Sequence, residues 1–493
     1  MSVDQFNVTL VAVSVVLIVA IVAVKLSARV GLPTLLIYLA IGMGIGESGL
    51  GVRFDDAELV QIVGLGLLAV ILAEGGLTTR WSVVRPVLAP SLVLATVGVA
   101  ISVAVTAYLS YWILGLELRT ALLLGAIVSS TDAAAVFSVL RRVRVNRRLA
   151  ATLEAESGFN DAPVVILVAV LVSDAWEQVN LQVAGGQMLL QLVAGAVVGL
   201  VVARGGELLL RRVALPSSGL YSIATMAIAL LAFGAAGALG ASSFIAVYLA
   251  GLRLGNARLP HEVETRTFAE GLAWLSQIGL FVLLGLLVSP SALPDAIVPA
   301  LVVGTVLLLV ARPLSVLLVA TPFRLPWRDQ VFLSWAGLRG AVPIVLATLP
   351  VSAGIPAATQ VFNVVFVLVV IFTLVQAPVL PRLARALRVD GLTVTRVPMP
   401  NAMRVELVAS EDLPVVGLRL ADLDLPTAVA VEAVVRDGAS VDPDPATVIR
   451  RGDRLVLHVP HRGRRSFDRC LRTLTGGSLS FPDDPPRGGD GAA

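Results

Sequence analysis

Long apolar runs separated by short polar connections fill the chain up to about residue 388. The runs lie at about 8–27, 33–50, 58–78, 86–112, 119–140, 149–173, 185–210, 219–236, 242–257, 266–289, 295–320, 329–350 and 359–384. A helix needs roughly 20 mostly apolar residues to cross the hydrocarbon core of a bilayer. The pattern therefore predicts an all-α polytopic membrane domain over residues 1–388, with about 13 transmembrane helices.

After this point the pattern changes to short segments in which apolar and polar residues alternate, as in half-buried strands. These segments are Arg404–Ala409, Ala428–Val435 and Arg454–Val459, with Asp, Gly and Pro between them. We expect a small α/β or mostly β domain over 402–462, joined to the membrane domain by a linker over 389–401. Residues 471–493 are rich in Gly, Pro and Asp, a composition that predicts a disordered tail.

The composition agrees with a membrane protein, because 57% of the residues are hydrophobic and only 14% are charged. Soluble chains are about a quarter charged. The mean hydropathy of +0.90 points the same way. The first apolar run follows Asp4 rather than a basic region, so we interpret it as a retained helix and not as a cleaved signal peptide.

Basic residues concentrate in every second connection between the runs. These connections hold Lys25/Arg29, Arg80/Arg85, Arg141/Arg142/Arg144/Arg147/Arg148, Arg204/Arg211/Arg212, Arg253/Arg258/Arg266, Arg324/Arg328 and Arg382/Arg385/Arg388. The other connections hold only Arg53 and Arg119, beside acids. Since cytoplasmic loops carry the excess of Lys and Arg, the N-terminus is predicted outside and the C-terminal domain in the cytosol. The same placement explains the net charge of +3 without a nucleic-acid partner.

Histidine and cysteine are absent from the apolar runs. The single cysteine is Cys470, and the three histidines are His261, His458 and His461. The chain therefore offers no disulfide framework or thiolate metal site, and no histidine-rich metal site within the membrane. A polytopic membrane enzyme would need such a constellation, so we predict that the protein is not an enzyme and binds no cofactor.

A few ionisable residues do lie inside the apolar runs. Those that stand out are Glu74 in the third run, Asp132 in the fifth, Glu154, Glu156 and Asp161 in the sixth, and Arg339 in the twelfth. A charged group at the centre of a membrane helix costs about 2.5–3.5 kcal/mol on insertion scales. Such residues usually mark ion pathways or buried ion pairs, which makes them the candidate functional residues.

Asp132 and Asp161 lie on consecutive runs, each preceded by small polar residues. The residues before Asp132 are Ser129, Ser130 and Thr131. Short hydroxyl side chains offer the backbone alternative hydrogen bonds, so this segment is predicted to unwind at mid-membrane, where unwound backbone is tolerated if it lines a cavity. Gly337, Gly340 and Pro343 predict a second broken helix around Arg339.

Interrupted helices in corresponding positions of two halves indicate the binding site of a secondary transporter. The fifth and sixth runs close one half of the membrane domain and the twelfth and thirteenth close the other. This order of runs predicts two repeats, although no residue identity between the halves supports it.

The oxygen ligands in these segments suit a monovalent cation, which prefers carboxylate, hydroxyl and carbonyl oxygens. A carboxylate that binds either a proton or a cation, but never both, produces exchange by competition. The Arg339 guanidinium stays protonated and needs a carboxylate partner, for which we choose Glu156. A cation channel would show a filter motif or charge rings, and neither is present. A sensor built on a transporter scaffold remains an alternative, which counterflow of protons and cations would separate from an exchanger.

Three motifs resemble those of the bacterial sodium(potassium)/proton antiporters of the NhaP type, which include potassium/proton antiporters linked to cell-volume regulation. The motifs are Thr131-Asp132, Glu156-Ser157-Gly158-x-Asn160-Asp161 and Gly337-Leu338-Arg339-Gly340. The resemblance covers about 8–388. It implies a thirteen-helix fold with two inverted repeats, a core domain that moves against a dimerisation domain, a homodimer, and a place in the bacterial cytoplasmic membrane among its lipids.

The resemblance also implies roles at the predicted ion site. Asp161 resembles the essential acid that binds the transported cation or a proton. Asp132 resembles its neighbour on the broken helix, which holds a water that is a cation ligand. Ser157 and the carbonyl of Thr131 resemble direct cation ligands, so the cation is expected at Asp161, Ser157 and Thr131.

Five further positions carry implied roles or differences. Glu74 resembles an additional acid near the cation, and Glu156 with Arg339 resembles a structural ion pair. Asn160 stands where electrogenic relatives carry a second acid, which implies electroneutral exchange of one cation for one proton. Phe159 is bulkier than the leucine more frequent in the family and leaves the ion preference open.

The segment 402–462 resembles the TrkA-C type of regulatory domain, the C-terminal half of potassium-conductance regulators. The resemblance lies in Pro414-Val-Val-Gly417, the residues Leu420, Leu423 and Leu425-Pro426, and Arg451–Leu457. It implies regulation by an unidentified cytosolic ligand, and it favours potassium over sodium as the exchanged ion. The sequence therefore predicts a K⁺/H⁺ antiporter with a role in cation, pH and volume homeostasis, with Na⁺/H⁺ exchange as the alternative.

Overall fold

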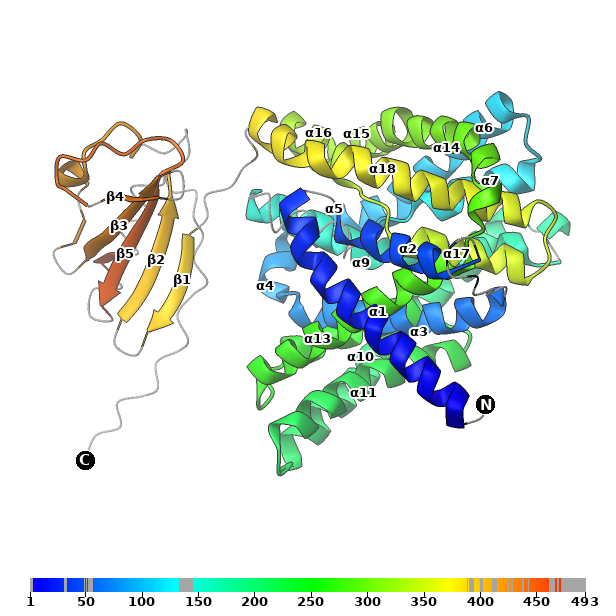
Figure 1. Cartoon of the computed structure of the whole chain (residues 1–493), viewed down its shortest axis with the longest axis horizontal. Helices are drawn as coiled ribbons and strands as arrows, with labels where there is room; N and C mark the ends of the chain where they lie inside the picture. The colour runs from blue at the N-terminus through cyan, green and yellow to red at the C-terminus, as the bar shows by residue number, and fades with distance from the viewer. Residues whose placement is uncertain are drawn as a thin grey trace. The chain divides into compact units, whose positions relative to one another are not determined.

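A computed structural model divides the chain into two compact units, with the boundary between Val389 and Asp390. The first unit is helical and the second is built on a β-sheet (Figure 1). The structure describes residues 3–470 apart from 31–32, 48, 50, 52–55, 133–144, 175, 179, 388, 390–393, 400–401, 410–414, 424, 427–428, 437–438, 442, 461–465 and 468–469. The tail predicted to be disordered, 471–493, lies outside these residues.

The helices of the first unit follow the apolar runs of the sequence. They are α1 (Val3–Val30), α2 (Thr34–Ile45), α3 (Ala57–Thr78), α4 (Trp81–Val84), α5 (Leu88–Val93), α6 (Val99–Leu114), α7 (Leu118–Ser129), α9 (Arg147–Val172), α10 (Leu181–Arg212), α11 (Ser218–Ala238), α12 (Ser243–Gly255), α13 (Glu262–Leu287), α14 (Pro294–Val306), α15 (Arg312–Ala320), α16 (Trp327–Ala336), α17 (Ala341–Ser352) and α18 (Ala358–Leu387).

Within the described residues, eight helical segments are long and apolar enough to cross a membrane, or nine if α16 and α17 form one bent span. Four shorter apolar helices lie on other predicted runs, namely 10–25, 34–45, 118–129 and 243–255. A mostly helical membrane domain is therefore confirmed. The count of thirteen spans and the inverted repeats remain predictions.

The end of α7 and the break between α16 and α17 meet inside this unit. Helix α7 ends at Ser129, and the backbone continues in extended conformation at Ser130. Helices α16 and α17 are bent by 50° across the break between Ala336 and Ala341. The backbone N–H of Asp132 donates a hydrogen bond of 3.0 Å to the carbonyl of Leu338. This bond gives a partner to one backbone donor that follows α7 and to one backbone acceptor between α16 and α17.

Glycines bring α3 and α12 into close contact next to this region. A Cβ added at Gly76 would lie 2.5 Å from the carbonyl oxygen of Tyr248, and one at Gly251 would lie 2.6 Å from that of Ala73. Membrane helices pack closely through such small residues. The close approach places the end of α3 beside Tyr248 on α12.

Helices α10 and α11 pack side by side (Figure 1), and α10 exposes a long apolar face. The exposed side chains include Val183, Leu189, Leu190, Val193, Val197 and Val201. A soluble monomer rarely exposes an apolar surface of this extent, so the face agrees with a surrounding of lipid or of another membrane protein.

The second unit is an antiparallel sheet with the strand order β1-β2-β5-β3-β4 (Figure 1). The strands are β1 (Val394–Met399), β2 (Ala402–Val408), β3 (Ala430–Arg436), β4 (Ala439–Val441) and β5 (Arg454–Pro460). Strand β1 pairs along its whole length with β2. The sheet therefore begins inside the segment predicted as a linker, and the prediction of a linker over 389–401 is wrong for these six residues.

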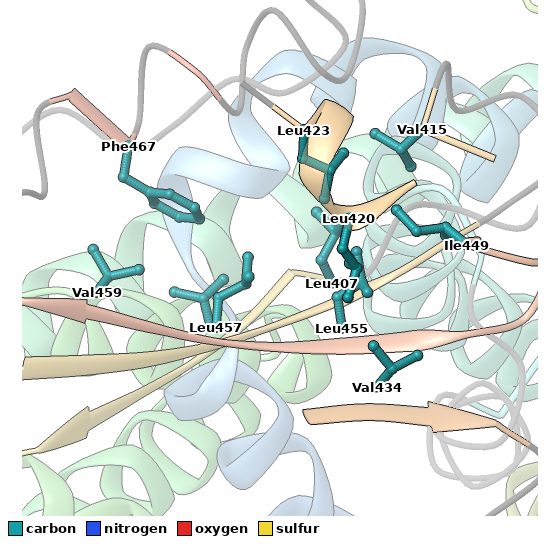
Figure 2. Packing of buried hydrophobic residues seen from close by; sticks show 12 residues of the cluster. Leu407, Val415, Leu420, Leu423, Val434, Ile449, Leu455, Leu457, Val459 and Phe467 are labelled. Carbon is teal, nitrogen blue, oxygen red and sulfur yellow. The ribbon is translucent and has the colours of Figure 1, made fainter. Parts of the chain in front are cut away.

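Apolar side chains cover one face of this sheet and form the core of the unit (Figure 2). Leu407, Leu455 and Leu457 come from β2 and β5, and Phe467 packs with them although it lies beyond the last strand. Along β5 the three consecutive residues Leu455, Val456 and Leu457 are all buried, so this strand departs from the simple alternation that the sequence pattern predicted. Pro414, part of the sequence motif, lies outside the described residues.

Candidate functional site

The residues singled out in the fifth and sixth runs lie together where the break after α7 faces α9. Ser130, Thr131 and Asp132 come from the break, and Ser157 and Asp161 come from α9. All five are buried, with at most 5% of the surface of any one exposed. Because buried polar groups must find partners, their mutual contacts define the chemistry of the site.

Asp161 has a single hydrogen-bond partner in the described part of the chain. The Ser130 hydroxyl donates to its Oδ1 at 2.5 Å, and no arginine, lysine or histidine of that part forms an ion pair with it. A buried carboxylate without a cationic partner is costly. A proton or a bound cation at Asp161 would remove this cost.

Asp132 is held by the second broken helix. Its Oδ2 accepts a hydrogen bond of 2.9 Å from the N–H of Ala341 at the start of α17, where the helix dipole favours negative charge. A Cβ added at Gly340 would lie 1.8 Å from that oxygen. The glycine is therefore required for the carboxylate to reach the helix end.

Thr131, Ser157 and Asn160 form a hydrogen-bonded group beside Asp161. The hydroxyl oxygens of Thr131 and Ser157 are 3.0 Å apart, and the amide of Asn160 donates to Thr131 at 2.5 Å. The other amide atom, Asn160 Oδ1, is buried and has no hydrogen-bond partner in the described structure. An amide oxygen is a suitable ligand for a hard cation.

The prediction that Glu156 forms an ion pair with Arg339 is wrong, because the arginine that pairs with Glu156 is a different one. Glu156 pairs with Arg312 of α15, whose Nη2 lies 2.8 Å from Oε2 while its Nη1 contacts Oε1. Both side chains are almost fully buried, and the two parallel bonds make the fork geometry that favours arginine. The position of Arg312 inside the eleventh apolar run was the signal for this partner, because a guanidinium at that depth requires one.

Arg339 is bound instead by backbone carbonyls that the broken helices leave open. Its Nε donates to the carbonyl of Val128 at 3.0 Å, and its Nη1 contacts the carbonyl of Gly337. The carbonyl of Arg339 accepts a hydrogen bond from Thr373 on α18. The last carbonyls of a helix are natural partners for a cation, whereas Arg339 Nη2 is buried without a hydrogen-bond partner in the described structure.

A cavity of about 30 Å³ adjoins Asp132 and Asp161, room enough for one or two waters or a dehydrated alkali cation. Gly75 of α3 and Thr79, which directly follows α3, line it, whereas the predicted ligand Glu74 does not. The cavity is also lined by Leu68, Ile71, Leu72, Glu154, Gly158, Tyr248, Gln277, Phe281, Ala341 and Val342. The sequence pattern did not assign a role to Glu154, Thr79 or Tyr248.

Comparison with protein families and known proteins finds two matching domain models. The model described as sodium/hydrogen exchanger, transmembrane, matches residues 14–386. The TrkA-C domain matches residues 404–469. Together they cover both units of the structure.

Several characterised proteins are similar over most of their length. The K(+)/H(+) antiporter NhaP of Alkalimonas amylolytica is 39% identical over 452 residues, which are 88% of this chain and 78% of that protein. The K(+)/H(+) antiporter NhaP2 of Shewanella sp. (strain MR-4) is 37% identical over 474 residues, 93% and 82% of the two chains. The Na(+)/H(+) antiporter ApNhaP of Aphanothece halophytica is 30% identical over 346 residues, 66% of each chain.

A solved structure shares the fold of the helical unit. The sodium proton antiporter MjNhaP1 from Methanocaldococcus jannaschii at pH 8 superposes with a TM-score of 0.67 at 23% identity, covering 78% of this chain and 99% of that one. At this level of identity the likeness concerns the fold alone.

Proposed function

The chain belongs to the sodium/hydrogen exchanger family of cation/proton antiporters and carries a TrkA-C domain, and we propose that it exchanges K⁺ for H⁺ at Asp161. The family consists of transporters and not of enzymes. The proposed cycle needs no resident cofactor, because the transported cation and the proton occupy the same carboxylate in turn.

The observation that carries the proposal is the isolation of Asp161 from every cationic side chain of the described structure. Its burial makes an empty, ionised state costly. Ser157, Thr131 and Asn160 Oδ1 lie next to it and supply further oxygens. A site that must hold either a proton or a cation, and that alternately opens to the two sides of a membrane, couples the flows of the two ions in opposite directions.

Two findings support potassium as the cation. The relatives with 37–39% identity are named K(+)/H(+) antiporters, and the TrkA-C domain is typical of potassium-linked regulation. Sodium is the alternative, because a less similar relative is named a Na(+)/H(+) antiporter. The lining of the cavity does not by itself discriminate between the two ions.

Electroneutral exchange is proposed from the neutral side chain at Asn160, which donates to Thr131 and adds no charge beside Asp161. One exchangeable carboxylate then carries either one cation or one proton. We expect the initial rate of exchange to be independent of an imposed membrane potential. A rate that changes with the potential would contradict one-for-one exchange.

Further parts of the proposal concern the setting of the protein. We place it in the bacterial cytoplasmic membrane as a homodimer, with the N-terminus outside and the TrkA-C domain in the cytosol, where a soluble ligand regulates it. The alternation of basic loops supports the orientation, and the exposed apolar face of α10 offers a surface for a second copy.

The test uses inverted membrane vesicles acidified inside and a fluorescent pH dye. Pulses of K⁺ or Na⁺ should dissipate the proton gradient with the wild-type chain, and K⁺ should act at the lower concentration. Asp161→Asn should reduce the response to that of vesicles without the protein, because the amide cannot exchange a proton for a cation. Asp295→Asn, which removes an exposed carboxylate, is the control and should leave exchange unchanged.

The outcomes separate the alternatives. A stronger response to Na⁺ would establish the sodium alternative. No response to either ion from inserted, folded protein at any pH would exclude exchange and favour a sensor.

A further inference from the structure

Three buried or half-buried glutamates of the helical unit differ in their surroundings. Glu156 pairs with Arg312. Glu207 pairs with three arginines, Arg204, Arg211 and Arg253, at 3.0, 2.9 and 2.7 Å. Glu154 lines the cavity beside Asp161 and pairs with no cationic side chain in the part of the chain that the structure describes. It therefore has the property that distinguishes Asp161, and its charge also needs a compensating ion or proton.

The partner of Glu154 is the hydroxyl of Thr79, which is fully buried at the end of α3. The same hydroxyl lies 2.6 Å from the carbonyl oxygen of Gly75. A hydroxyl has one hydrogen to donate, so it cannot serve both oxygens at once. The arrangement leaves oxygen lone pairs from two residues turned toward each other, as in a site for a cation.

Tyr248 adds a third oxygen to this end of the cavity. Its hydroxyl is buried and lies close enough to Thr79 and Glu154 to interact electrostatically. The hydroxyl has no hydrogen-bond partner in the described structure. The ring is fixed, because it packs edge-on against Phe159 with centroids 5.1 Å apart. A Cβ added at Gly158 would lie 2.6 Å from the ring, so the glycine allows the tyrosine to reach the cavity.

Glu154, Gly158 and Asp161 follow one face of α9 with the spacing i, i+4 and i+7. At 1.5 Å per residue, Glu154 is displaced from Asp161 by roughly 10 Å along the helix. Both side chains line the same cavity. The two carboxylates therefore lie along one wall of the cavity, about two helical turns apart in the backbone of α9.

We propose that Glu154, Thr79 and Tyr248 form a second site for a monovalent cation, which holds the ion on its way to or from Asp161. The site rests on the proposed exchange function, and it takes the same class of ligand, an alkali cation stripped of part of its water. Its three ligands are a carboxylate, a threonine hydroxyl and a tyrosine hydroxyl, all hard oxygens.

The first test measures the apparent KM for K⁺ in the vesicle assay at fixed pH. Glu154→Gln keeps the side-chain shape and a hydrogen-bond acceptor for Thr79 but removes the charge. We expect its KM to rise about tenfold, equivalent to about 1.4 kcal/mol, with the maximal rate retained because Asp161 is intact. Tyr248→Phe removes only the hydroxyl, and we expect a smaller rise in KM in the same direction.

The matched control is Thr78→Val. Thr78 neighbours Thr79, but its hydroxyl bonds only to backbone carbonyls of α3 and it does not line the cavity. Its KM should equal that of the wild type. An unchanged KM in both Glu154→Gln and Tyr248→Phe, or a shifted pH profile at constant KM, would overturn the cation site; the second result would identify Glu154 as a proton carrier.

A binding measurement separates this proposal from the exchange function. The measurement is the binding of radioactive rubidium to purified full-length protein. The variant Asp161→Asn should still bind rubidium, but more weakly than the wild type. The double variant Asp161→Asn/Glu154→Gln should lose this remaining binding. Equal binding by these two variants would refute the second site even if transport is confirmed. Persistent exchange in Asp161→Asn would refute the proposed role of Asp161, while the rubidium component could still establish the site at Glu154.

Discussion

Among single residues, the buried carboxylates are distinguished by the charges around them. Glu156 and Glu207 form ion pairs with arginines, whereas the hydrogen-bond partners of Asp161 and of the half-buried Glu154 in the described structure are hydroxyl groups. Breaking a buried pair or leaving a buried charge alone costs several kcal/mol. An acid that the fold leaves without a cation is therefore the place to expect an exchangeable ion.

Asp453 in the TrkA-C domain shows the opposite case outside the membrane. Arg436 donates two hydrogen bonds to it, at 2.8 and 2.7 Å, and the N–H of Arg450 donates a third. The hydrogen bonds from Arg436 hold the pKa of Asp453 below its usual value. Since the folded-state pKa is lowered, the stabilisation is complete above the unfolded-state pKa of about 4 and is lost as the pH falls toward the folded-state value.

We expect Asp453→Asn to destabilise this domain by about 3 kcal/mol at neutral pH, the lower end for breaking a buried pair. The difference from wild type should shrink below about pH 4, where the wild-type carboxyl also takes up a proton. The measurement is the urea concentration at which the amides of β5 in the full-length protein lose protection from deuterium exchange. Asp444→Asn is the control, because Asp444 is exposed and no arginine of the described residues pairs with it. Equal stability of Asp453→Asn and wild type at pH 7 would contradict the argument.

Among the elements, the end of α7 and the break between α16 and α17 determine the architecture of the site. The break after α7 supplies Asp132 to the start of α17, and the break between α16 and α17 supplies Leu338 to Asp132. Two π-helical turns, Leu94–Gly98 and Leu307–Ala311, lie in the fourth and eleventh apolar runs. The first packs against α15 and the second packs against α6. This correspondence supports the predicted repeat, which stays a prediction.

The link between α9 and α15 gives a test at this scale. Glu156→Gln and Arg312→Met should each lower the free energy of unfolding by about 3–5 kcal/mol, because each leaves a buried charge alone. The double variant should lose less than the sum, since neither member of the pair is left charged without the other. Thermal unfolding in detergent gives the four values of the cycle. The control cycle combines Glu156→Gln with Arg211→Met, whose effects on the free energy of unfolding should add. Additive effects of Glu156→Gln and Arg312→Met would contradict an energetic coupling between Glu156 and Arg312.

For the whole molecule, the two units have separate cores. The helical unit contains every residue of the proposed ion sites, and the second unit has a hydrophobic core of its own (Figure 2). Ion exchange should therefore belong to the first unit, and the TrkA-C domain should modify it.

Removal of residues 390–493 should leave cation-dependent proton movement in place but change its rate or its dependence on pH. The cut precedes β1, because a cut at 401 would leave one strand of the sheet behind. Vesicle assays across a range of pH compare this variant with full-length protein. Removal of 471–493 alone is the matched control, and superimposable curves for all three chains would rule out regulation by the domain.

The sequence by itself determined the class of the protein, because membrane spans and alternating strands have local patterns with fixed lengths and periods. It also located the carboxylates, the hydroxyl residues that precede Asp132, and the glycines of the break between α16 and α17. It could not determine the partners of Glu156 and Arg339, the isolation of Glu154 or the start of the sheet at Val394. Arg312 is 156 residues from Glu156, and Thr79 is 75 residues from Glu154. Which side chains meet depends on how helices distant in the sequence pack and cross, and this information exists only in the tertiary structure.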